Sequence, residues 1–257
     1  MPMRHLLAIP VFNEEKHVLG VLSEAGRFAD HILVVDDGST DATPALLRRP
    51  GLHVITHPEN RGYGKSLADA FAFAVHKGYD WLITMDCDEQ HEPSQIPRFL
   101  SAAARDDADI ISGTRYPRGR EADSSAPADR RRINRIITAM LNQRLALNIT
   151  DAFCGFKAYR VAGLSCLHIT IPGYAMPMQM WVQVARAGLR VRELPVRLIY
   201  NDPNRHFGGM LDDADVRLRH YMDVFEAEFA SLSTPCDAEL RAVRPCRSGD
   251  PCLTSRS

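Results

Sequence analysis

Short apolar segments alternate with longer segments of helical periodicity through residues 5–114, and this alternation limits the fold more than any other feature. The apolar segments are rich in Val, Ile and Leu, as strands buried in a parallel sheet are. Alternating strands and helices predict an α/β fold, a doubly wound, mostly parallel sheet with helices on both faces. We expect strands over residues 5–10, 32–35, 52–56, 81–85 and 109–113.

The second half of the chain begins with a long polar segment. Residues 116–129 are rich in Pro, Gly, Ser, Arg and Asp, which is typical of a loop, and we expect this loop to close over a substrate as a lid. A helix follows that opens with Arg130, Arg131, Arg132 and Arg135, whose side chains either lie in solvent or bind an anion. Further strands are expected within residues 151–159 and 190–200, and further helices over residues 175–187 and 212–230.

The composition excludes several classes of protein. A net charge of -1 gives no global field for nucleic acid. The six cysteines form no Cys-x-x-Cys pair, which argues against a zinc site or a disulfide framework. The chain contains no apolar run near the ~18 residues of a membrane span and no signal-peptide core, so we expect a cytoplasmic protein without a transmembrane span.

Two carboxylates follow the apolar segment 81–85. Asp86 and Asp88 are separated by one residue, so in an extended chain their side chains leave on the same side. Ligands of open α/β sheets bind at the carboxyl ends of the strands. Carboxylate oxygens with Gln90 nearby suit Mg²⁺ or Mn²⁺ bound together with a substrate's phosphates. A solvated Asp-rich turn is the alternative, because Asp-x-Asp alone is a weak motif.

A glycine-rich segment, Asn60-Arg-Gly-Tyr-Gly-Lys-Ser66, precedes a helical apolar stripe. A helix N-terminus preceded by glycine attracts phosphate, which makes Lys65 a candidate for binding the phosphates of a ligand. The segment lacks the first glycine of a Walker A loop. A dehydrogenase is also disfavoured, because no Gly-x-Gly-x-x-Gly follows the first strand.

Seven motifs occur in order along residues 5–210. They are Pro10-Val-Phe-Asn-Glu14, Val34-Val-Asp-Asp-Gly-Ser39, Asn60-Arg-Gly-Tyr-Gly-Lys65, Asp86-Cys-Asp-Glu-Gln90, Ser112-Gly-Thr-Arg-Tyr116, Asp151 with Gly155-Phe-Lys157, and Gly188-Leu-Arg-Val-Arg-Glu-Leu-Pro195. Together they resemble the family 2 nucleotide-diphospho-sugar glycosyltransferases of the GT-A fold. Within that family the chain is most similar to the dolichyl-phosphate mannose synthase branch.

The resemblance implies a pocket for a GDP- or UDP-linked sugar. Pro10, Phe12 and Glu14 would line it, with Phe12 facing the base or ribose; core packing is the alternative for Phe12. Asp36 would accept hydrogen bonds from the base, and Val34 would pack beside it. Which base and which sugar are bound stays open.

The resemblance also implies a metal and phosphate site. Asp86 and Asp88 would bind a divalent metal that bridges the two phosphates, with Gln90 as a neutral oxygen ligand. A dication and arginines offset the charge that grows on a departing diphosphate. The other implied members are Arg115, facing the sugar-phosphate, Arg205, on the pyrophosphate, and Cys87, through its backbone only.

The implied reaction is direct displacement at the anomeric carbon with inversion. A phosphate acceptor, such as a polyprenyl phosphate met at the membrane surface, is already anionic and needs no strong base. A hydroxyl acceptor needs a carboxylate base. Asp151 is then the candidate, with a turn-capping role as its alternative, and Asp212 and Asp213 are weaker candidates. Mannose synthases usually carry a Lys where this chain has these two acids, which puts the lipid acceptor in doubt.

The resemblance divides the chain as follows. We expect one GT-A domain over residues 1–230, with a nucleotide-binding half (1–115), an acceptor-side half (116–230) and a small antiparallel element. Residues 231–257 are polar and aperiodic, which predicts a disordered tail. Two other functions remain open: a sugar-phosphate nucleotidyltransferase and a degenerate transferase that only binds nucleotide.

Overall fold

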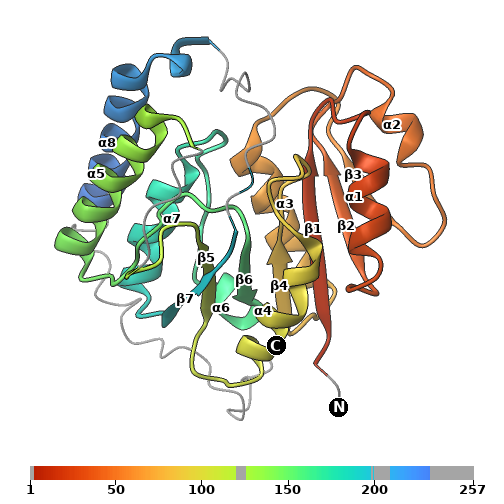
Figure 1. Ribbon diagram of the computed structural model, residues 1–257, viewed down its shortest axis with the longest axis horizontal. Helices are drawn as coiled ribbons and strands as arrows, with labels where there is room; N and C mark the ends of the chain where they lie inside the picture. Colours follow the sequence, from red (N-terminus) through yellow and green to blue (C-terminus); the bar gives the residue numbers. More distant parts are fainter. Residues whose placement is uncertain (1–2, 120–125, 198, 200–208, 232–257) are drawn as a thin grey trace, which may run out of the picture.

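A seven-stranded sheet forms the centre of the computed structural model (Figure 1), which describes residues 3–119, 126–197, 199 and 209–231. The strand order is β3-β2-β1-β4-β6-β5-β7, and β6 runs antiparallel to both of its neighbours while the other pairs are parallel. This confirms the predicted fold class. The strands are β1 His5–Val11, β2 Ile32–Asp36, β3 His53–Thr56, β4 Trp81–Thr84, β5 Ile110–Thr114, β6 Lys157–Arg160 and β7 Val191–Pro195.

Helices cover both faces of the sheet. Along β1, Leu6 and Ala8 belong to one buried core while Leu7 and Ile9 belong to the other, because successive side chains of a strand point to opposite faces. The first core contains residues of α3, α5, α6, α7 and α8, and the second contains residues of α1 and α4. The helices are α1 Val18–Ala25, α2 Thr43–Leu46, α3 Tyr63–His76, α4 Ile96–Ala103, α5 Ala128–Leu145, α6 Val161–Leu164, α7 Met176–Arg186 and α8 Ala214–Ser231, with 3-10 turns η1 Pro93–Gln95 and η2 Gly209–Asp212.

Two predicted strands are shorter than expected. The segment predicted within residues 151–159 is a loop until Lys157, where β6 enters between β4 and β5. The segment predicted over residues 190–200 ends as a strand at Pro195. Of the predicted lid, residues 120–125 lie outside the described residues, as does the tail 232–257.

Candidate active site

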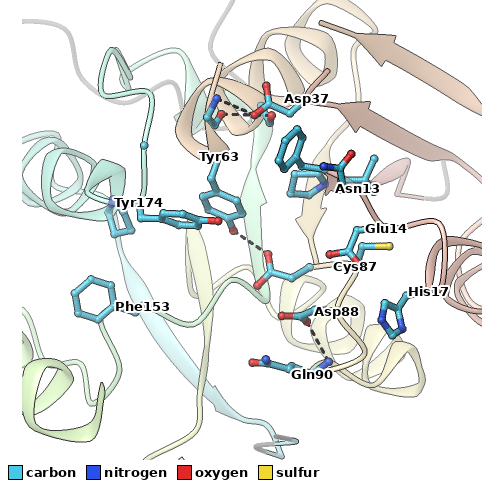
Figure 2. Close-up of a pocket in the computed structure, with 18 of the residues that line it drawn as sticks. Asn13, Glu14, His17, Asp37, Tyr63, Cys87, Asp88, Gln90, Phe153 and Tyr174 are labelled. Atoms are coloured by element: carbon cyan, nitrogen blue, oxygen red, sulfur yellow. Dashed lines mark hydrogen bonds between the residues drawn. The ribbon is translucent and has the colours of Figure 1, made fainter. Parts of the chain in front are cut away.

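A cavity of about 960 Å³ lies at the carboxyl ends of the parallel strands and is lined by both halves of the chain (Figure 2). The loops after β1, β2, β4 and β5 contribute residues, and so do α5, α8 and the segment before α7. A cavity of several hundred cubic ångströms is the usual size for a site that encloses a small molecule. The placement agrees with the expectation for an open α/β sheet.

The loop after β1 lines one end of the cavity. Pro10, Phe12 and Glu14 are all among its walls, and Phe12 is 43% exposed, so it is not a core residue. Asn13 does not cap α1: its side-chain oxygen accepts the backbone N–H of Thr40 and so joins this loop to the one after β2. This position fits the prediction that the loop binds the nucleotide, and the separate roles of Pro10, Phe12 and Glu14 stay predictions.

Asp36 and Val34 do not reach the cavity wall. Both are fully buried. One oxygen of Asp36 accepts the N–H of Ser39, and the other is buried without a hydrogen-bond partner among the described residues. Of the two adjacent aspartates, Asp37 is the one that lines the cavity, because adjacent residues at a strand end point in opposite directions.

Asp37 is held by a buried histidine. Its Oδ1 lies 2.6 Å from Nδ1 of His57, and Nε2 of His57 lies 2.8 Å from a carboxylate oxygen of Asp69. Asp37 also accepts the backbone N–H groups of Arg61 and Gly62. The network therefore fixes the segment that leads into α3.

Lys65 is not at the cavity wall. Its ammonium pairs with Asp69 one turn along α3. The backbone N–H of Lys65 donates to the carbonyl of Pro172, so the amino end of α3 is partly covered by the segment before α7. Asn60, Gly62, Tyr63 and Ser66 of the same segment do line the cavity, so phosphate binding at this helix end stays a prediction, without a contact from the side chain of Lys65. Arg205 lies outside the described residues.

Asp86, Asp88 and Gln90 line the middle of the cavity. Oδ1 of Asp86 accepts the hydroxyl of Tyr63 at 3.0 Å, and Oδ1 of Asp88 accepts the N–H of Gln90 at 3.1 Å. Burial and the charge of Asp86 raise the pKa of the Tyr63 phenol well above its usual value, so the hydroxyl keeps its proton and donates it. Cys87, between the two carboxylates, is 2% exposed.

Asp86 is confined further by Gly155. A Cβ on Gly155 would lie 2.3 Å from Oδ2 of Asp86, so only glycine leaves room for this carboxylate. Two carboxylates and an amide around one space form a donor set that suits a hard dication sharing its ligands with phosphate oxygens. Within the described part of the chain no three His, Cys, Asp or Glu side chains converge on one ion position.

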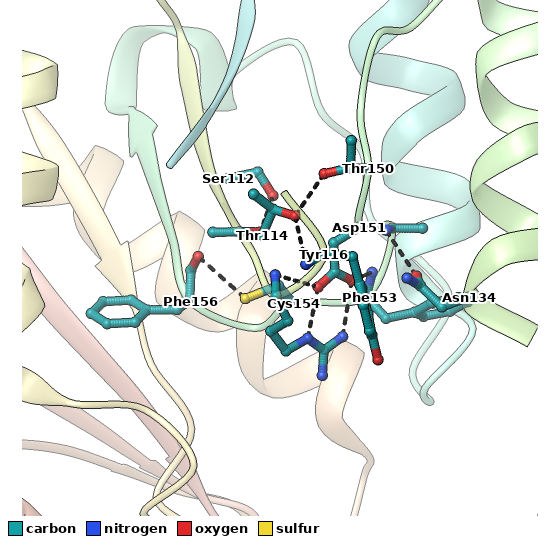
Figure 3. Close-up of polar contacts among 12 residues, drawn as sticks. Ser112, Thr114, Tyr116, Asn134, Thr150, Asp151, Phe153, Cys154 and Phe156 are labelled. Atoms are coloured by element: carbon teal, nitrogen blue, oxygen red, sulfur yellow. Dashed lines mark hydrogen bonds and ion pairs between the residues drawn. The ribbon is translucent and has the colours of Figure 1, made fainter. Parts of the chain in front are cut away.

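Arg115 follows β5 and lines the cavity, and its guanidinium is held by Asp151, which is labelled in Figure 3. Asp151 lies in the loop before β6, is fully buried and accepts two hydrogen bonds from the guanidinium. Its backbone N–H, with that of Thr150, donates to Glu193. Burial alone would raise the pKa of Asp151, but the charge and hydrogen bonds of Arg115 hold it below its usual value.

These surroundings argue against Asp151 as a general base. Its oxygens accept hydrogen bonds from Arg115 and from the N–H of Phe153, and it does not line the cavity. A carboxylate with a lowered pKa is a weak proton acceptor. Asp213 caps α8 by accepting the N–H groups of Asp215 and Val216. The base role stays a prediction, and the geometry favours positioning of Arg115.

The far end of the cavity combines cations with aromatic rings. Arg130 of α5 and Arg217 of α8 line it together with Phe153, Tyr174 and Tyr221. Phe153 packs against Tyr221 with ring centroids 4.9 Å apart. The arginines at the start of α5 were expected either to lie in solvent or to bind an anion. Arg130 lines the cavity, where it can bind an anion.

Several residues that line the cavity were not predicted from the sequence. Tyr63 and Asp37 lie inside the quoted motifs, and the alternation of side chains at the end of β2 could have identified Asp37. Tyr174 and Arg217 come from segments far from the carboxylates in sequence, so no local pattern marks them.

The sequence of this chain is similar to those of known glycosyltransferases. The model of glycosyl transferase family 2 matches residues 7–167. An undecaprenyl-phosphate mannosyltransferase of Micrococcus luteus is 31% identical over 232 residues, 85% of this chain and 94% of that protein. A polyprenol monophosphomannose synthase of Mycolicibacterium smegmatis is 28% identical over 204 residues, 75% of this chain and 76% of that protein.

A solved structure shares the fold. Glucosyl-3-phosphoglycerate synthase from Mycobacterium tuberculosis, crystallised with Mn²⁺, uridine diphosphate and glucosyl-3-phosphoglycerate, superimposes with a TM-score of 0.68. The match covers 89% of this chain and 81% of that one, at 18% identity. At this identity the likeness supports the fold alone.

Proposed function

Because this chain belongs to glycosyl transferase family 2, we propose that it moves a sugar from a nucleotide diphosphate sugar to a polyprenyl phosphate, with inversion and with a divalent cation. The observation that carries the proposal is the single cavity that holds Phe12 at one end, Asp86, Asp88 and Arg115 in the middle, and Arg130 and Arg217 at the other end. The named relatives act on undecaprenyl phosphate or polyprenol, which supports the acceptor class.

The donor would bind along the first part of this cavity. Its base would lie at the loop after β1, and its diphosphate would lie next to Asp86 and Asp88. A divalent cation held by Asp86, Asp88 and Gln90 would offset the charge of the departing diphosphate. Arg115, fixed by Asp151, would present a planar fork to the phosphate oxygens. GDP and UDP sugars both fit this proposal.

The acceptor would approach from the far end. A phosphate oxygen carries its own negative charge, so it attacks the anomeric carbon without a protein base, which agrees with the occupied oxygens of Asp151. Arg130 would attract the phosphate, while Arg217, at the same end, is buried and already paired with Asp129. The repulsion expected from Asp212 and Asp213 is reduced, because neither lines the cavity and Asp213 caps α8.

A lipid acceptor requires contact with a bilayer. No helix in the described part of the chain is long and apolar enough to cross one. Because the relatives' names give a lipid phosphate as acceptor, we propose a peripheral encounter at the cytoplasmic surface of the membrane. Residues 1–115 and 116–230 would be the donor and acceptor halves of one functional unit.

Transfer assays test the proposal. The protein would be incubated with Mn²⁺ or Mg²⁺, GDP-mannose or UDP-glucose, and undecaprenyl phosphate in detergent, with lipid products identified by mass spectrometry. We expect the wild type to form glycosyl undecaprenyl phosphate. We expect no lipid product with undecaprenol, which lacks the phosphate, and no product from the Asp88→Asn variant. Nucleotide-sugar made from a sugar phosphate would instead indicate a nucleotidyltransferase. Nucleotide binding without turnover would indicate a degenerate transferase.

A further inference from the structure

Tyr174 reaches into the cavity from the segment before α7 (Figure 2). The residue is 43% exposed, although most large aromatic side chains of the described chain are buried. Its ring stacks on that of Tyr63, with centroids 5.8 Å apart and planes 20° apart. An aromatic ring left accessible inside a cavity is a common feature of a ligand contact.

The position of Tyr174 is fixed by the backbone. The segment before α7 lies directly against the start of α3: a Cβ on Gly62 would be 2.4 Å from the carbonyl oxygen of Pro172, and one on Gly64 would be 2.2 Å from that of Ile171. The N–H of Lys65 donates to Pro172 at 3.1 Å. A ring held in this way loses little freedom when a ligand binds, which favours affinity.

The same stack is connected to the carboxylates. The hydroxyl of Tyr63 donates to Asp86, so the Tyr63–Tyr174 pair stands one side chain away from the proposed diphosphate position. In the view of Figure 2, Asn13 and Glu14 lie on one side of Asp88 and Tyr174 lies on the other. The sugar of a nucleotide diphosphate sugar is bonded to the second phosphate, so it continues from the carboxylates away from the base.

We propose that Tyr174, stacked on Tyr63, forms the binding surface for the transferred sugar ring of the donor. The negative face of an aromatic ring attracts weakly positive C–H groups, which a pyranose presents on its ring faces. This inference rests on the proposed function, since it assigns a subsite of the same donor. The acceptor phosphate would lie beside this surface, at Arg130 of the same end of the cavity.

Calorimetric titration in Mn²⁺ tests the subsite. The wild type, Tyr174→Ala, Tyr174→Phe and Phe12→Ala would each be titrated with GDP, GDP-mannose, UDP and UDP-glucose. The measured quantity is the ratio of the dissociation constant of the free nucleotide to that of its sugar derivative. We expect Tyr174→Ala to lower this ratio by about five- to tenfold, the scale of one aromatic contact, with free nucleotide binding unchanged.

The two other variants provide controls. Tyr174→Phe keeps the ring and should keep the wild-type ratio, while Phe12→Ala, at the base end, should weaken nucleotide and nucleotide-sugar together and leave the ratio unchanged. An unchanged ratio in Tyr174→Ala, or equal weakening of both ligands, overturns the subsite while leaving the proposed function intact. If the wild type binds no nucleotide sugar, the proposed function and the subsite both fail.

Discussion

The guanidinium of Arg115 and the carboxylate of Asp151 meet at two points, Nε to Oδ2 at 2.7 Å and Nη2 to Oδ1 at 2.9 Å, and Asp151 has no exposed surface. The pair joins the end of β5 to the loop before β6. It therefore sets the direction in which the cation enters the cavity.

Replacing Asp151 with Asn tests this positioning role. Removing the charge of Asp151 leaves Arg115, whose side chain is 21% exposed, without its charged partner, so we expect the free energy of unfolding to fall by about 1–3 kcal/mol. Transfer should fall with it, because Arg115 is no longer held. Urea denaturation and the transfer assay measure the two effects. A variant of wild-type stability that binds nucleotide but has no activity would instead support Asp151 as the base.

Replacing Gly155 with Ala should disturb Asp86. The new Cβ would lie 2.3 Å from Oδ2 and 2.8 Å from Cγ, so the carboxylate must move. We expect about a tenfold or greater loss in Mn²⁺-assisted nucleotide binding, equivalent to about 1.4 kcal/mol. Titration of Mn²⁺ by electron paramagnetic resonance, with and without nucleotide, measures it. Gly20→Ala in α1 is the control, since its Cβ would meet Glu89 only at 3.9 Å.

Replacing His57 with Gln should destabilise the segment before α3, which lines the cavity. The variant loses one or both of the contacts to Asp37 and Asp69, so Asp37 no longer fixes the segment before α3. We expect a loss of about 1–3 kcal/mol in stability, typical of a broken buried polar contact, and weaker nucleotide binding. His53→Gln, an exposed position in β3 shortly before His57, is the control. Equal behaviour of the two variants would contradict the role of His57.

The ion-pair cluster at Asp109 predicts a pH dependence of stability. Burial would raise its pKa, but hydrogen bonds and charge from Arg190, with charge from Arg160, hold it below the usual 3.8. A carboxyl whose folded pKa is lowered stabilises the protein above its unfolded pKa, and this contribution is lost as the pH falls through the folded value. We expect Asp109→Asn to cost about 1–2 kcal/mol at pH 7.

Denaturation at a series of pH values measures this effect. The difference between the wild type and Asp109→Asn should stay constant well above pH 3.8 and shrink below it. Because Asp109 lies at the opposite end of β5 from Arg115, nucleotide binding should not change. A difference that is the same at acid and neutral pH would show that the charge of Asp109 does not contribute.

Local patterns predicted most of the fold. The strands at β1, β2 and β4 appear within one or two residues of their predicted bounds, because apolar runs buried on both faces are strong signals. The same patterns do not reveal that β6 is reversed, since strand direction depends on the partner strands rather than on residue type. The predicted strand before Lys157 is a loop, because Asp151 is held there by Arg115 and Glu193, which are distant in sequence.

The candidate site was predicted in part. Asp86, Asp88, Gln90, Arg115, Phe12 and Glu14 meet at one cavity, as expected from their places at strand ends. Lys65, Asp36 and Asp151 do not line it, because each is occupied or enclosed by groups that are distant in sequence. The position of a residue at the end of a predicted strand indicates the edge of the sheet where it lies. Whether its side chain lines the cavity depends on contacts with residues that are distant in sequence.

The place of β5 in the sheet has a consequence for synthesis of the chain. Its neighbours are β6 and β7, which both come later in the sequence. A nascent polypeptide that ends soon after Thr114 therefore carries a strand without any partner, and β4 keeps one edge unpaired until Lys157 emerges from the ribosome. The sheet that positions Asp86 and Arg115 is therefore complete only after β6 and β7 have been translated.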